Sequence, residues 1–324
     1  PIRSIMDDDW QSAPSSSGDY GFSQSLAGMK LETDSWHLSL IKRKDYFLRT
    51  NPDSLVLYHF TESEFPTEQV RQYEVDINYR QIKALGIKAG YKIEIMPGLL
   101  VSGRLGYWHP DKARHSSLVG DVISDDSKDN NQLSGTAELE EWYTWNNLLR
   151  RPGDSEWQQC YGVTFDVEVH WRVNDKLDVK LVFEDLYSEF SFENIGYSKG
   201  AINSETSFKD DKNITRFNPA YTGVESQREK DLELPTYRSV LVNTELDIGK
   251  LQFHYEKRDI VDFFTLAMEK TLQNYQVNLG YEFAKQCVSV EVKKAWFNLL
   301  LSTDNLNLSK AKQLKLSAGL SYQF

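Results

Sequence analysis

The stretch that decides the fold is Val163–Arg172, which reads VTFDVEVHWR. Apolar residues occupy every odd position of this stretch, and polar or charged residues occupy every even position. Successive side chains of a strand point to opposite faces, so the stretch predicts a strand with one apolar and one polar face. A helix would spread the same apolar residues around its whole cylinder.

The same alternation recurs along the chain, in some stretches less strictly. The stretches that share it are Tyr73–Arg80, Ile87–Ile95, Leu177–Glu184, Leu251–Arg258, Tyr275–Phe283 and Val288–Lys293. Turn-forming residues such as Pro97-Gly98, Asn174-Asp175 and Gly249-Lys250 separate several of these stretches. The sequence therefore predicts an all-β protein built from antiparallel strands.

Composition argues against two classes of protein, helical membrane proteins and nucleic-acid-binding proteins. No stretch approaches the roughly 18 consecutive apolar residues of a membrane helix, whereas a barrel strand shows lipid only every second residue. The net charge of -11 argues against a nucleic-acid partner, because phosphate binding needs a basic surface. No charged and apolar leader precedes Pro1, so we expect any signal peptide to have been removed already.

The last predicted strand is Leu314–Phe324, where apolar and polar residues again alternate. Its final eight residues, SAGLSYQF, resemble the C-terminal β-signal of Gram-negative outer-membrane β-barrel proteins. Gly319, Tyr322 and the terminal Phe324 carry this resemblance. It implies recognition by the barrel-assembly machinery and insertion into the bacterial outer membrane, in contact with its lipid and lipopolysaccharide.

The expected fold is a closed antiparallel transmembrane β-barrel over residues 20–324. Length suggests about 14 strands, with 12 or 16 as alternatives because bacterial single-chain barrels have an even number. Segment 1–19 lacks alternation and is expected to be an N-terminal extension or plug. Long polar connections are expected at 109–131, 148–159 and 190–234. A soluble β-sandwich, whose polar face is simply wet, is the competing interpretation.

In a barrel the polar face of the strands lines the lumen. Those charges either brace the wall as cross-strand ion pairs or select solutes. The expected lumen-lining residues are Glu74, Asp76, Arg80, Lys88, Lys92, Glu94, Asp166, Glu168, His170, Arg172, Asp178, Lys180, Glu184, His254, Glu256 and Arg258.

The sequence offers little support for an enzyme, a metal site or a cofactor, and we expect none. Neighbouring polar residues between Asp166 and Arg172 lie about 6.6 Å apart along one strand face, too far to share an ion. None of the six His residues lies in a motif that resembles the barrel enzymes. Cys160 and Cys287 have no metal-ligand spacing, and whether they pair stays open.

Two functions therefore compete. The first is a channel or porin-like protein for small solutes. The alternative is an outer-membrane anchor or assembly subunit of a surface or secretion complex, which would hold a protein partner through residues 1–19 or the 190–234 loop.

Overall fold

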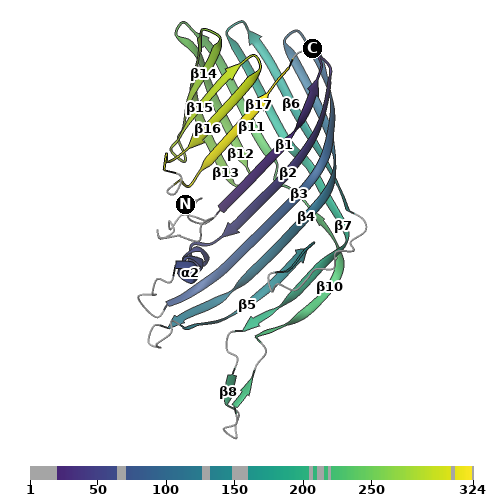
Figure 1. Cartoon of the computed structure of the whole chain (residues 1–324), viewed down its shortest axis with the longest axis vertical. Helices are drawn as coiled ribbons and strands as arrows, with labels where there is room; N and C mark the ends of the chain where they lie inside the picture. The colour runs from purple at the N-terminus through teal and green to yellow at the C-terminus, as the bar shows by residue number, and fades with distance from the viewer. Residues whose placement is uncertain are drawn as a thin grey trace.

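The computed structural model describes residues 20–63, 71–125, 132–147, 160–203, 207–209, 215–217, 220–307 and 311–322. These residues form one antiparallel sheet of 15 strands, a two-stranded hairpin and one helix (Figure 1). The predicted all-β, antiparallel class is confirmed. Segment 1–19 and the connection 148–159 lie outside the described residues.

The elements follow one another along the chain as a meander. The strands of the sheet are β1 (Tyr20–Glu32), β2 (Trp36–Thr50), β3 (Arg71–Met96), β4 (Leu99–Asp125), β5 (Gln132–Tyr143), β6 (Cys160–Asn174), β7 (Leu177–Asn203), β10 (Tyr221–Leu232), β11 (Tyr237–Leu246), β12 (Gly249–Arg258), β13 (Val261–Leu272), β14 (Tyr275–Glu282), β15 (Cys287–Lys294), β16 (Phe297–Thr303) and β17 (Leu314–Leu320). The hairpin is β8 (Ser207–Lys209) with β9 (Thr215–Phe217), and the helix is α2 (Pro52–Ser63).

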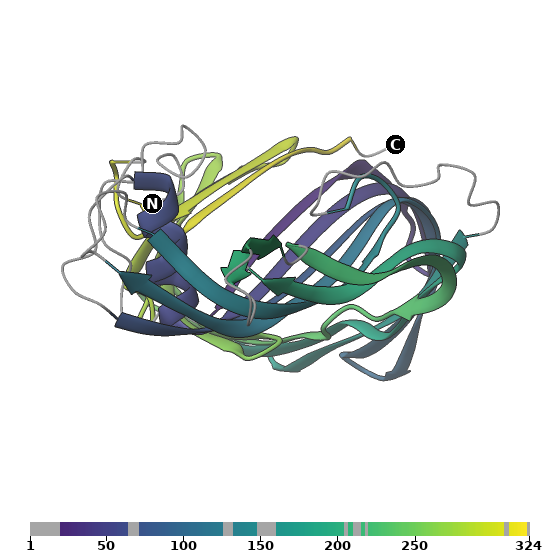
Figure 2. The ribbon, with the colours of Figure 1, turned by 90° about the horizontal axis from the view of Figure 1, so that it is seen from below.

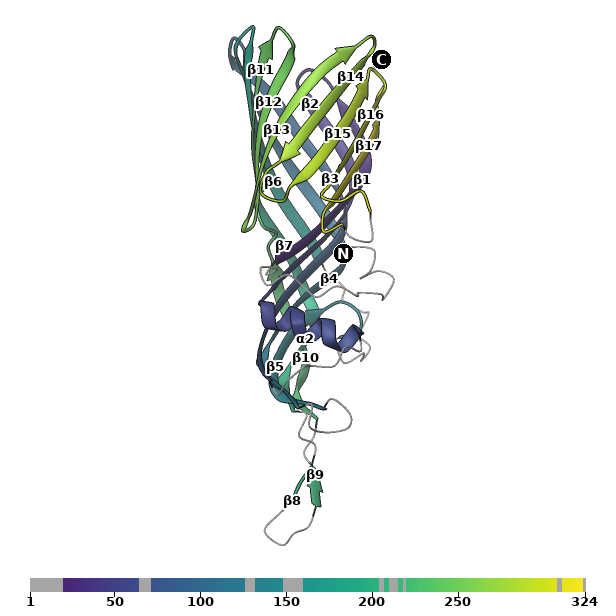
Figure 3. The same cartoon turned by 90° about the vertical axis from the view of Figure 1, so that its left-hand side faces the viewer.

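The sheet has two parts, and three long strands connect them. Strand β4 pairs with β6 through Leu99–Trp108 and then with β5 through Arg114–Asp125, so β5 and β6 share one position beside it. Strand β7 likewise pairs first with β11 and then with β10. We call the part with β1, β2, β6 and β11–β17 the upper sheet, and the part with β5 and β10 the lower sheet. Strands β3, β4 and β7 run through both (Figures 1 and 3).

The strand count differs from the expected 14. The order from β1 to β17 holds 13 positions, because β5 with β6 and β10 with β11 each occupy a single one. All neighbours are antiparallel, so β1 and β17 at the two ends of this order run in the same direction. The sheet curls round on itself (Figure 2), and among the described residues no ladder joins β1 to β17.

Two of the three expected long connections are mostly strand. The 109–131 region continues β4 as far as Asp125, and the 190–234 region contains the end of β7, the β8–β9 hairpin and β10. The prediction of a 190–234 loop is therefore wrong. Strand β10 reads YTGVESQREKDL, pairs with β7, and is largely exposed except at Leu232, its last residue. A strand whose two faces are both mostly exposed has little reason to alternate.

Helix α2 was not expected from the strand pattern, although its start has a recognisable cap. Asn51 accepts a hydrogen bond from the Ser54 backbone N–H at 2.9 Å, and Pro52 opens the first turn. The Ser54 hydroxyl in turn accepts from the Asp76 backbone N–H of β3 at 2.9 Å, which fixes the helix on the lower sheet. The described residues contain no helix long and apolar enough to span a membrane.

Gly86 on β3 allows the Trp108 ring to lie against the sheet. A Cβ at Gly86 would overlap the Trp108 ring, which is 1% exposed. We expect Gly86→Ala to lower the free energy of unfolding by about 1–3 kcal/mol, because the ring must shift within a packed interior. Gly103→Ala on β4 is the matched control, since its Cβ would make an ordinary 3.5 Å contact with Phe165. Equal unfolding midpoints for the two variants in denaturant would contradict this account.

Candidate functional site

The register places most of the predicted lumen residues on one face of the upper sheet. Residues directly opposite each other on neighbouring strands share a face, which we call the inner face because contacts cross the rolled sheet from it. In the upper sheet it carries Lys88, Lys92, Glu94, Asp166, Glu168, His170, Arg172, Asp178, Lys180, Glu184, His254, Glu256 and Arg258. Glu74, Asp76 and Arg80 lie on the same face of β3, but within the lower sheet.

Ion pairs connect several of these residues into a ladder. Asp166 accepts from the Lys88 ammonium at 2.6 Å, and the Arg104 guanidinium lies 3.6 Å from it. Glu168 lies 2.7 Å from Lys180 and 3.4 Å from Arg104. Arg104 was not among the predicted residues, because its stretch of β4 is rich in glycine and shows little alternation.

Arg43 of β2 connects two opposite parts of the inner face. It was not among the residues predicted from the sequence. Its guanidinium donates to both carboxylate oxygens of Asp185 at 3.0 and 2.8 Å, and to Asp45 at 2.7 Å. All three side chains are at most 3% exposed. Strands β2 and β7 are not neighbours in the sheet, so this fork crosses the interior. Within the Lys-Arg-Lys-Asp run of β2, Arg43 and Asp45 cannot be told from solvated charges by sequence.

The backbone of Asp185 also takes part in this network. Its φ of 52° lies in the left-handed region, which a residue other than glycine adopts at a cost. Its backbone N–H donates to Asp166 at 2.9 Å, which joins the Arg43 fork to the Lys88–Asp166 ladder. The Trp108 ring lies 4.9 Å from the Arg43 guanidinium and provides a cation–π contact.

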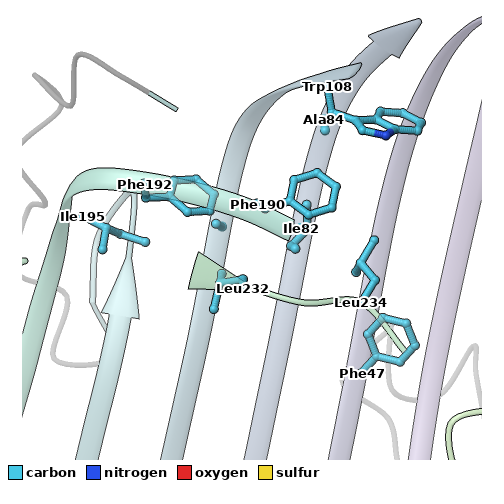
Figure 4. Close-up of a cluster of buried hydrophobic side chains, with 10 residues drawn as sticks. Phe47, Ile82, Ala84, Trp108, Phe190, Phe192, Ile195, Leu232 and Leu234 are labelled. Carbon is cyan, nitrogen blue, oxygen red and sulfur yellow. The ribbon is translucent and has the colours of Figure 1, made fainter. Parts of the chain in front are cut away.

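An apolar layer fills the interior beside this ion network. We call the two together the waist. In Figure 4 the segment of β7 that carries Phe190 and Phe192 crosses over the strands that carry Ile82 and Trp108. The buried members of the layer are Phe47, Ile82, Ala84, Trp108, Ala113, Phe190, Phe192, Ile195, Leu232 and Leu234. The waist therefore places packed side chains between β2 and β3 on one side and β7 and β10 on the other.

Further contacts cross the interior of the upper sheet. Arg49 of β2 pairs with Asp259, which lies between β12 and β13. Phe22 of β1 packs edge-to-face on Phe263 of β13 at 6.1 Å. Lys315 of β17 lies 3.5 Å from Glu256 of β12. Both ends of the strand order thus contact the strands that lie opposite them.

A pocket of about 290 Å³ lies beside the waist on the upper side. It is lined by charged and polar side chains of the inner face, together with the apolar residues of β1. Its ionisable lining residues are Lys30, His37, Lys88, Arg104, Asp166 and Glu184. Lys88, Arg104 and Asp166 of the ion network thus line this pocket.

The inner face of the lower sheet carries aromatic and basic side chains. Trp142 lies between His115 and Tyr197, with ring centroids 5.6 and 5.1 Å away. The Lys230 ammonium lies 4.2 Å from the Trp142 ring. Burial, with the charges of Arg80 and Lys230, lowers the pKa of His115 to about 4. This imidazole is therefore neutral at physiological pH.

One group has the residue types of a hydrolase triad without its geometry. Ser239 lies 2.8 Å from Nε2 of His254, but Nδ1 of His254 lies 3.8 Å from Glu256, beyond hydrogen-bonding distance. Ser239 is 5% exposed, and Glu256 is already engaged by Tyr237 and Lys315. The described residues also bring together no group of three or more His, Cys, Asp or Glu side chains suited to a metal ion.

The open question about the cysteines has an answer in the structure. Cys160 and Cys287 are free thiols. Cys160 donates to the Pro110 carbonyl, and Cys287 donates to Gln313 at 3.2 Å. Each thiol acts as a small, partly buried polar group.

The residues of the expected assembly signal are only partly described. Gly319 lies in β17, which ends at Leu320, and Tyr322 is 80% exposed just beyond it. Phe324 lies outside the described residues. Comparisons with known proteins gave no match: no family model, no curated protein and no solved structure matches this chain.

The Arg43 fork gives a direct test of the waist. Arg43→Ala leaves the buried carboxylates of Asp45 and Asp185 without their cation, which is expected to lower the free energy of unfolding by about 3–5 kcal/mol. Arg49→Ala removes another cross-interior ion pair whose arginine is half-exposed, and is expected to cost about 0–1 kcal/mol. Denaturant titration of both variants measures the difference. Similar losses would show that the waist contributes no special stability.

Proposed function

We propose that this protein is a closed outer-membrane β-barrel whose lumen is blocked at the waist, and that it anchors a surface-exposed assembly. The exposed apolar outer face of the upper sheet supports the membrane location. Leu38, Ile87, Leu279, Leu299 and Leu316 alternate with inner-face residues and are 47–70% exposed. A soluble protein rarely leaves so large a contiguous apolar surface in water, whereas a barrel turns such a surface toward lipid.

Aromatic residues border this outer face at both ends, as expected at membrane–water interfaces. Near the short turns stand Trp36, Tyr91, Tyr275 and Trp296, of which Trp36 packs on Tyr91 at 4.9 Å. Near the opposite end stand Tyr46, Tyr161, Tyr187, Tyr255 and Tyr281. The two groups bracket the proposed bilayer-spanning part of the sheet.

Closure of the barrel is supported by the contacts that β1 and β17 make across the interior. An unpaired strand edge in lipid leaves backbone N–H and C=O groups without partners, each at a cost of several kcal/mol. The membrane location therefore demands a partner for β1 and for β17. Since these two strands run in the same direction, closure requires either a parallel ladder between them or an additional strand.

The turns suggest which side faces the cell surface. The connections at one end, such as 33–35, 97–98 and 175–176, are short, while the lower-sheet end has the longer ones, such as 51–70 and 304–313, beside a two-residue turn at 259–260. Outer-membrane barrels have short periplasmic turns and longer extracellular loops. The lower sheet is then extracellular, and the SAGLSYQF end is periplasmic.

The waist favours an anchor over an open pore. Its buried fork and apolar layer span the interior from β2 and β3 to β7 and β10. The lower sheet, with the polar edge strand β10 and the β8–β9 hairpin beyond it, offers a surface for a protein partner. The channel function has separate support from the charged pocket above the waist, which would serve as a vestibule.

A pair of adjacent leucines tests the membrane location. Leu299 faces outward and Leu300 faces inward, opposite Glu291. We expect Leu299→Arg to destabilise the protein folded in phosphatidylcholine vesicles by about 2–4 kcal/mol if it lies near the bilayer midplane, because lipid cannot solvate the charge. Leu300→Arg is the matched control and should cost less, beside the carboxylate of Glu291. Equal stability of Leu299→Arg and the unaltered protein would contradict a lipid-facing position.

Conductance in planar bilayers separates the anchor from the channel. We expect no steady pore-sized conductance from the unaltered protein, because packed side chains fill the waist. Phe190→Ala, which opens a cavity in the apolar layer, should raise conductance if the waist is the block. Heat-modifiable gel mobility checks that the variant is folded, and deletion of residues 1–19 tests a separate block there. A porin-sized conductance of the unaltered protein would refute the blocked lumen.

A further inference from the structure

A row of lysines crosses the outer face of the sheet where its apolar surface ends. On β2 the outward residues Leu38 and Leu40 are followed by Lys42 and Lys44. Lys44 lies opposite Lys83 of β3, and Lys83 lies opposite Lys112 of β4. Since directly opposed residues share a face, three neighbouring strands change from apolar to basic at matched positions. We call Lys42, Lys44, Lys83 and Lys112 the basic row.

The charges of this row are largely uncompensated. Lys83 pairs with Asp111, the extra residue of a bulge in β4. Lys42, Lys44 and Lys112 are exposed and form no ion pair with the described part of the chain. The hydrogen bond from Lys83, with the charges of Lys83, Lys112 and Lys42, lowers the pKa of the Asp111 carboxyl. One carboxylate thus faces four ammonium groups, in a chain whose net charge is -11.

Aromatic rings accompany the lysines as they do at a membrane surface. The Lys44 ammonium lies 4.8 Å from the Tyr46 ring, and Lys112 lies 5.6 Å from the Trp145 ring. Such rings prefer the level of lipid head groups. An ammonium group on a lipid-facing surface is costly in the hydrocarbon but favourable beside an anionic head group. The far side of the barrel differs, because Lys257 there pairs with Asp262 at 3.5 Å.

We propose that the basic row binds the phosphate groups of a lipid head group in the outer leaflet. The inference rests on the proposed membrane location and adds a specific lipid site to it. Neighbouring strands are about 5 Å apart, so lysines at matched positions on adjacent strands form a row with that spacing. Two or three of their ammonium groups can therefore contact one doubly phosphorylated head group. The apolar face formed by Leu38, Leu40 and Leu85 would hold its acyl chains.

The experiment uses lipid A, which carries two phosphates, as the probe in phosphatidylcholine vesicles or mixed micelles. The variant replaces Lys42, Lys44 and Lys112 by Gln and leaves the Lys83–Asp111 pair in place. The matched control replaces Lys176, Lys270 and Lys294 by Gln, which removes the same charge at the short-turn end. We expect the first variant to bind lipid A about 100-fold more weakly, and the control to bind it like the unaltered protein. Binding should also weaken as salt rises.

The possible failures are distinguishable. A protein that folds in phosphatidylcholine vesicles but shows equal lipid A affinity in all three forms overturns the lipid site and leaves the barrel standing. A protein that does not fold in vesicles overturns the barrel proposal itself. Inorganic phosphate should not displace lipid A at comparable concentration, because it lacks the acyl chains. Displacement by phosphate alone would show a free-anion site and would overturn the assignment to a lipid.

Discussion

Backbone hydrogen bonding along a continuous sheet is the constraint on which the other features depend. Most strands pair with neighbours on both sides, so their side chains have only the two faces of the sheet to occupy. On the upper sheet these faces differ sharply, with leucines, isoleucines and aromatic residues outside and ion pairs inside. The alternation in sequence is the direct result, and a one-residue slip of any strand would reverse it.

Charges on the inner face are stable because they are paired. A buried guanidinium such as Arg43 is strongly destabilising alone, but here three hydrogen bonds to two carboxylates offset its desolvation. The left-handed backbone at Asp185 presents both oxygens to that guanidinium and a backbone N–H to Asp166. The apolar layer beside the fork keeps water away from it. The waist therefore joins residues as far as 142 positions apart in the chain.

The sequence could predict those strands whose two faces lie in different surroundings. Val163–Arg172 and Tyr275–Phe283 alternate because their outer residues face away from the interior; the first lies within β6, and the second forms β14 except for Phe283 in the turn that follows. Sequence could not predict the continuations of β4 and β7, since the lower sheet lacks that contrast between its faces. Arg43 and Asp45 were missed for a related reason: their burial comes from β7 crossing the inner face, a contact between distant segments that local pattern does not contain.

The unbroken strands that run through both sheets have a mechanical consequence. Strands β4 and β7 have 27 residues each, which at about 3.3 Å per residue is roughly 90 Å of continuous hydrogen-bonded chain. No linker separates the part proposed for the bilayer from the part proposed for the cell surface. The lower sheet therefore behaves as a stiff arm rather than a tethered domain. If the proposed barrel changes its tilt with bilayer thickness, the distal hairpin moves through an arc that the length of this arm enlarges.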